Sequence, residues 1–147
     1  MEVLRGTALI EDCALANGGT GITVAGGKTR AFLRRLDLRG FRTSAVMISS
    51  RATARLDGCR MAGNRSGLTA NDGAVAGVEG CRIEGGHHGI GFGSRSGGMV
   101  EGSEITRTTY AGILVREGAD RAVRRGTMHH GNFGIEVRDR GKGPVEE

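Results

Sequence analysis

The sequence predicts an all-β solenoid of about six coils of 22–23 residues, in which three short strands per coil stack into three parallel sheets. One observation behind this is a repeat that stays in register at two separate positions. Another is an apolar pattern with a period of two residues. The third is composition, because 28 glycines and one proline among 147 residues indicate many tight turns. We expect residues 1–147 to form a single domain.

The repeat is defined by two anchor positions that advance together along the chain. The first anchor recurs every 22 or 23 residues, and the second is preceded in each unit by a glycine or an alanine. Because both anchors advance by nearly the same interval, the period indicates a structural unit rather than chance similarity. The first anchor is occupied by Cys13, Leu36, Cys59, Cys81, Ser103 and Gly126, and the second by Ile22, Val46, Leu68, Ile90, Ile113 and Ile135.

Within each unit the apolar residues form three short pairs, whose members are two residues apart. Such alternation predicts strands of about three to five residues with one buried face. Strands that wind in the same sense stack as parallel sheets, about 4.8 Å apart from coil to coil. The coils are expected at residues 7–30, 31–53, 54–75, 76–97, 98–120 and 121–143, followed by a tail at 144–147.

This pattern resembles the right-handed parallel β-helix of the pectate-lyase-like superfamily over roughly residues 7–143. The resemblance implies a polysaccharide ligand that lies along the sheet containing Gly89–Phe92. It does not extend to the acidic clusters of the hydrolases or of the calcium-dependent lyases of that superfamily, which have no counterpart in this sequence.

Composition argues against several classes of partner. The net charge is +5, but Asp and Glu are interleaved with the Arg residues and no basic stripe carries stacking aromatics, so we expect no nucleic-acid partner. No segment has the apolar length of a membrane span, so we expect no membrane partner. The first residues lack the parts of a secretory signal, and the sequence gives no localisation.

The three cysteines share the inward first-anchor position, where a thiol packs as a small apolar group. We expect Cys13, Cys59 and Cys81 to be free and buried, and we expect no cofactor and no metal. The alternative is a metal site formed by two histidine pairs, which would lie about 10 Å apart on loops two coils apart. The pairs are His87/His88 and His129/His130.

Candidate reactive residues precede the second-anchor strand in the last three units. The repeat places His87, Tyr110 and Asn132 on one line, with His88 and Phe133 beside it. Imidazole and phenol groups are common proton carriers. The expected ligand-binding residues are His87, His130, Asn132, Phe133 and Glu136.

Two functional hypotheses follow. The first is a non-catalytic module for scaffolding or for binding, with carbohydrate as the expected ligand, in which these residues are ordinary polar groups on exposed turns. The second is a small polysaccharide lyase or C5-epimerase acting on uronates, as the resemblance implies. In that case His88 or Tyr110 would move the proton, and Arg116 or Arg138 would bind the substrate carboxylate.

The first coil also suggests self-association. It begins at about Thr7, and no amphipathic helix precedes it to cover the open end of the solenoid. Leu9 and Phe32 should be adjacent and solvent-facing on the first two coils. We therefore expect a homo-oligomer that forms through the N-terminal coil.

Overall fold

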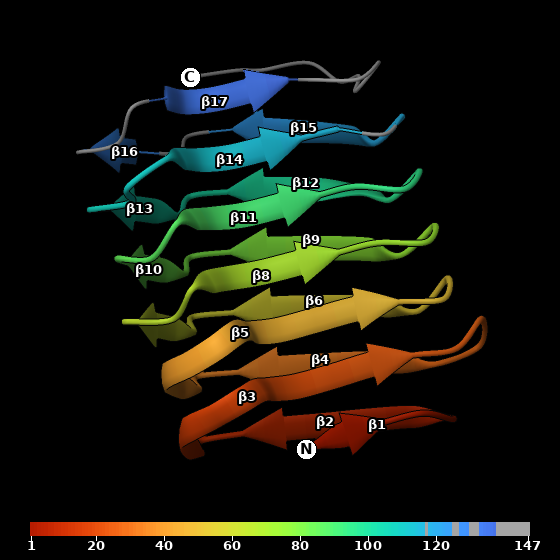
Figure 1. The fold of residues 1–147 in the computed structure, drawn as a ribbon. Coiled ribbons are helices and arrows are strands. Elements are labelled where there is room, and N and C mark those ends of the chain that lie inside the picture. The colour runs from red at the N-terminus through yellow and green to blue at the C-terminus, as the bar shows by residue number, and fades with distance from the viewer. Residues whose placement is uncertain (117, 125–126, 130–132, 138–147) are drawn as a thin grey trace.

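The structure is a computed structural model that describes residues 1–116, 118–124, 127–129 and 133–137. In these residues the regular secondary structure consists of β-strands alone (Figure 1). The strands are β1 (Glu2–Val3), β2 (Thr7–Glu11), β3 (Ala14–Ala25), β4 (Arg30–Arg34), β5 (Asp37–Ser49), β6 (Thr53–Asp57), β7 (Arg60–Ala62), β8 (Ser66–Ala70), β9 (Val75–Glu79), β10 (Arg82–Glu84), β11 (His88–Phe92), β12 (Gly97–Glu101), β13 (Glu104–Thr106), β14 (Ala111–Val115), β15 (Asp120–Arg124), β16 (Thr127–His129) and β17 (Phe133–Val137).

The strands wind into a parallel β-solenoid whose coils follow the predicted repeat. Ile90 pairs with Leu68 on one side and with Ile113 on the other, so residues one period apart lie on touching coils. One sheet has six strands in the order β15-β12-β9-β6-β4-β2, with one strand from each repeat unit. The predicted all-β fold with parallel sheets is confirmed, and Figure 1 shows its coils stacked along one axis.

The other strands form one eleven-stranded sheet, because two long strands join faces that the repeat predicts as separate. In the first two coils β3 and β5 run for 12 and 13 residues around the corner. From the third coil onward this face divides into strands of three and of five residues. Gly63 and Gly85, with φ of 64° and 79°, end the short strands there and begin the turns that lead to the longer ones.

The interior is a stack of aliphatic side chains that each contact their equivalents in the neighbouring coils. Val46, Leu68, Ile90 and Ile113 have no exposed surface. Cys59 and Cys81 are free and buried, as predicted. The prediction of a buried thiol is wrong for Cys13, which is exposed because its coil has a neighbouring anchor residue on one side only.

The small residue before the second anchor is required by close packing at the corner of the coil. A Cβ atom at Gly89 would lie 2.5 Å from Cγ2 of Ile105 and 2.8 Å from the carbonyl oxygen of Gly112. The same position one coil earlier, Gly67, would bring a Cβ within 2.7 Å of the carbonyl oxygen of Gly89. Glycine at this position therefore leaves the space that the side chains of Ile83 and Ile105 occupy in the interior.

We predict that Gly89→Ala lowers the free energy of unfolding by about 1–3 kcal/mol, because the added methyl group meets backbone that cannot move aside. Gly19→Ala is the matched control, since a Cβ there would meet nothing within 4 Å. Urea unfolding followed by far-ultraviolet circular dichroism measures both. Equal stability of the two variants would contradict the packing described for this corner.

Candidate functional site

A ladder of two-residue turns follows β5, β8, β11 and β14. Each turn is closed by a hydrogen bond across four residues, as from the amide of Ala52 to the carbonyl oxygen of Ser49 at 3.0 Å. The central residues have left-handed φ, for example 54° at Ser50 and 63° at Arg51. These are the dihedral signs of a type I′ turn. The turns also bond to one another, since the Arg51 amide donates to the Asp72 carbonyl oxygen at 3.0 Å.

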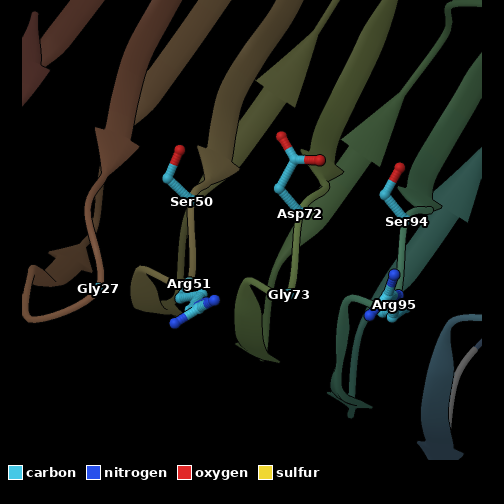
Figure 2. A pocket seen from close by; sticks show the side chains of 7 residues that line it. All are labelled: Gly27, Ser50, Arg51, Asp72, Gly73, Ser94 and Arg95. Carbon is cyan, nitrogen blue, oxygen red and sulfur yellow. The ribbon is translucent and has the colours of Figure 1, made fainter.

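A groove of about 730 Å³ runs along this ladder. Figure 2 shows Ser50, Asp72 and Ser94 in one row at the ends of the strands, and Arg51 and Arg95 in the next row. The residues lining the groove are Gly27, Ser50, Arg51, Asp72, Gly73, Ser94 and Arg95.

The two arginines of this groove each lie against a glycine of the following coil. A Cβ at Gly73 would be 3.4 Å from Cγ of Arg51, and one at Gly118 would be 3.9 Å from Cγ of Arg95. The aliphatic part of each arginine therefore covers backbone, while its guanidinium group is in solvent. In the described part of the chain neither arginine has an ion pair, nor does Asp72, which lies on the coil between them.

The line predicted from the repeat is present at His87 and Tyr110. Their rings stack with centroids 5.0 Å apart and an interplanar angle of 13°. The amide of Tyr110 donates to the carbonyl oxygen of His87 at 2.9 Å. Because 5.0 Å is close to the distance between coils, this is an aromatic ladder on consecutive turns.

His88 lies against the sheet, beside this line. Its Nε2 atom is 3.0 Å from Oγ of Ser66. The ring extends over Gly91, where a Cβ would lie 3.2 Å from Nε2. Its Nδ1 atom is buried and has no hydrogen-bond partner among the described residues. Burial, reinforced by His87, Arg116 and Arg65, lowers the pKa of His88 to about 4.

This environment restricts what His88 can do chemically. With a pKa of about 4 its imidazole is neutral near pH 7, so it lacks the acidic proton of an imidazolium and is a weak base. The pair of Ser66 and His88 has the distance of a nucleophile and its base. Ser66 is only 5% exposed, however, so a substrate has no access to its hydroxyl. The hydrogen bond holds the histidine ring in the space that Gly91 leaves.

The other predicted site residues are placed as follows. Arg116 is exposed and comes directly after β14, at the opposite end of that strand from Tyr110. Glu136 is half-buried on β17, in register with Leu114. The backbone of Phe133 begins β17. Three predicted site residues, His130, Asn132 and Arg138, lie outside the described residues.

Within the described residues no group of three or more His, Cys, Asp or Glu side chains is placed to hold a metal ion. No helix there is long and apolar enough to cross a membrane.

The groove residues Arg51, Asp72 and Arg95 were not among the residues predicted for a site. The sequence does contain a signal for them. Ser50-Arg51, Asp72-Gly73 and Ser94-Arg95 recur at intervals of 22 residues, between one strand and the next. When these turns are aligned by coil, Arg51, Asp72 and Arg95 place a positive, a negative and a positive charge on three consecutive coils.

The fold and its turn ladder define a parallel β-solenoid protein. Comparison with protein families matches residues 20–146 to the family described as "Right handed beta helix region". The chain belongs to this family, and the match is consistent with the resemblance to the pectate-lyase-like superfamily. No curated protein and no solved structure matched the chain.

We predict that the free energy of unfolding decreases as the pH is lowered from about 6.5 to about 4, because His88 must then be protonated. The pKa of this residue is lower in the folded chain than in the unfolded chain, so the unfolded chain binds more protons in that window. Urea unfolding at about pH 7 and about pH 4.5 measures the effect. His88→Gln should flatten the dependence, whereas His87→Gln, at an exposed position, should keep most of it, because burial is the larger cause of the lowered pKa. Equal slopes for the wild type and His88→Gln would contradict the burial of this imidazole.

Proposed function

We propose that this chain is a non-catalytic binding module whose turn groove holds an extended acidic glycan. The observation that carries the proposal is the groove of about 730 Å³ in which Arg51 and Arg95 flank Asp72. The chemistry, the spacing and the order of these groups each support this ligand class.

The chemistry of the groove suits a molecule that bears both carboxylates and hydroxyl groups. A guanidinium group binds a carboxylate through two parallel hydrogen bonds, and arginine is always charged. The hydroxyl groups of Ser50 and Ser94 and the carboxylate of Asp72 are acceptors for sugar hydroxyls. The aliphatic part of each arginine adds an apolar surface for a sugar ring.

The spacing of the groove suits an extended chain. Arg51 and Arg95 are two coils apart, which corresponds to about 9.6 Å along the solenoid. This is close to the length of a disaccharide in an extended glycan. Asp72 lies on the coil between them and would repel a carboxylate at the middle sugar. The pattern therefore favours a glycan in which acidic and neutral sugars alternate over one made of uronates alone.

The properties of His88 support binding rather than catalysis. The lyase or epimerase hypothesis requires His88 or Tyr110 to move a proton from the sugar. His88 has a pKa of about 4 and is held by Ser66 beneath the exposed turn. The charge of Arg116, expected to bind the carboxylate in that hypothesis, also helps to lower the pKa of His88 and so opposes protonation of this imidazole.

We predict that Arg51→Gln and Arg95→Gln each weaken binding of an alternating uronate–hexosamine oligosaccharide by about tenfold, since each loses one charged pair. Isothermal titration calorimetry at low salt measures the dissociation constant. Arg42→Gln is the matched control, because it removes the same charge from an exposed position outside the groove. In the same assay Asp72→Asn should improve binding of an all-uronate oligosaccharide.

Binding that is unaffected by both groove substitutions, or weakened equally by Arg42→Gln, would overturn the proposed site. A separate assay keeps the enzymatic hypothesis testable. If the protein releases unsaturated uronate from a panel of acidic polysaccharides, and His88→Ala and Tyr110→Phe abolish this, the chain is a lyase and the proposal of a non-catalytic module is wrong.

A further inference from the structure

We propose that Cys59 and Cys81 form a buried two-coordinate site for a soft divalent metal ion of the Hg(II) kind, which the sulfur atoms hold between two adjacent coils. This site lies inside the solenoid, apart from the turn groove, and does not depend on glycan binding. It revises the expectation that the chain binds no metal.

The two thiols occupy equivalent places on neighbouring coils. The amide of Arg82 donates to the carbonyl oxygen of Cys59 at 2.9 Å, so the backbones at this position are hydrogen-bonded from coil to coil. Sγ of Cys59 lies 3.7 Å from the carbonyl oxygen of Asp57, and Sγ of Cys81 lies 3.4 Å from that of Glu79. Each thiol therefore points to the carbonyl group two residues before it, and the two side chains have the same orientation.

The distance between the sulfur atoms suits an ion better than a disulfide. Side chains of equal orientation on adjacent coils are separated by about 4.8 Å. The thiol of Cys81 lowers the pKa of Cys59, so the two groups are close enough to interact directly. A disulfide bond is about 2.05 Å long, less than half of the coil spacing. Two metal–sulfur bonds of about 2.3 Å each, placed in line, span about 4.6 Å.

The number of ligands selects the kind of ion. A structural zinc ion is almost always bound by four ligands. The described part of the chain contains no group of three or more His, Cys, Asp or Glu side chains that could hold an ion, so it provides only the pair of thiols. Thiolate sulfur prefers soft ions. Hg(II) is such an ion, and two thiolates in line satisfy its coordination.

The apolar interior selects the charge of the ion. Cys59 and Cys81 are 1% and 2% exposed, and a net charge at such a place is costly. When a divalent ion enters, two S–H bonds break, two sulfur–metal bonds form and two protons pass to the solvent. No electron is transferred, and the bound group is neutral. A monovalent ion between two thiolates would leave one negative charge in the interior.

The site has a short path from the solvent. Gly58 and Gly80 directly precede the two cysteines, and both glycines are exposed at the corner of the coil. Their φ angles of 62° and 59° turn the chain there, so that the next side chain enters the interior. The thiols are therefore buried directly beneath exposed turns.

The next coil shows that serine can replace cysteine at this position. Oγ of Ser103 donates to the carbonyl oxygen of Glu101 at 3.1 Å and accepts from the amide of Cys81 at 3.1 Å. One coil earlier, the backbone of Cys59 makes the equivalent hydrogen bond to the side chain of Cys81. Exchange of serine and cysteine along this column therefore keeps the local hydrogen bonds.

Two double variants test the spacing with the number of thiols unchanged. Both are made in a Cys13→Ser background, because Cys13 is an exposed free thiol. Cys81→Ser with Ser103→Cys leaves two thiols that are two coils, or about 9.6 Å, apart, which is too far for one ion. Cys59→Ser with Ser103→Cys leaves two thiols on adjacent coils, displaced by one coil from the natural pair.

The reduced proteins are titrated with mercuric chloride in the presence of an excess of a monothiol competitor. Native mass spectrometry counts the bound ions and the displaced protons, and the ultraviolet sulfur-to-metal charge-transfer band follows binding. We expect the Cys13→Ser parent and the adjacent-coil variant to bind one ion per chain with loss of two protons. The variant with separated thiols should bind about a hundredfold more weakly, because its second thiolate cannot reach the same ion.

The single variant Cys81→Ser should lose the ion in the same way, so the test does not depend on one double variant. Far-ultraviolet circular dichroism compares the folds of all four proteins. Equal affinity of the variants with separated and with adjacent thiols, or a parent that retains no ion against the monothiol, would overturn the proposed site.

Discussion

Backbone hydrogen bonds between consecutive coils are the interaction on which the whole structure depends. The same bond recurs at the first anchor of each coil. The amide of Arg60 donates to the carbonyl oxygen of Leu36 at 2.8 Å, and the equivalent bonds one and two coils later are 2.9 Å long. Because each coil binds the next with the same register, residues separated by one period become neighbours. Rows of side chains inside and outside the solenoid follow from this ladder.

The turns and the six-stranded sheet present these rows in different ways. On the turns, left-handed residues such as Arg51 project from the ladder, and charges of opposite sign alternate at the distance between coils. On the six-stranded sheet, an outward row of large side chains is interrupted at Gly77. The turn groove requires no reactive group. It requires that the coils remain in register over several repeats, which the stacked interior provides.

Much of the fold could be predicted from the sequence, because the inward anchors are apolar in almost every repeat and fix the register. The joining of two predicted strands into β5 could not be predicted, because residues typical of a turn, such as Gly40, lie within this strand. The stacking of His87 on Tyr110 follows from the period alone. The position of His88 does not, because it depends on the space above Gly91, three residues further along the same strand. The turn groove was not predicted, because its residues come from separate turns and form a site only when the coils stack them in a column.

The central claim, that residues one period apart lie on touching coils, is tested most directly by nuclear Overhauser contacts between methyl groups of the interior. The account predicts a continuous series from Val46 to Leu68, from Leu68 to Ile90, and from Ile90 to Ile113. It predicts no contact between Leu68 and Ile113, which are two coils apart. Absence of the contacts between adjacent coils, or a strong contact that skips a coil, would contradict the register and the proposed turn groove.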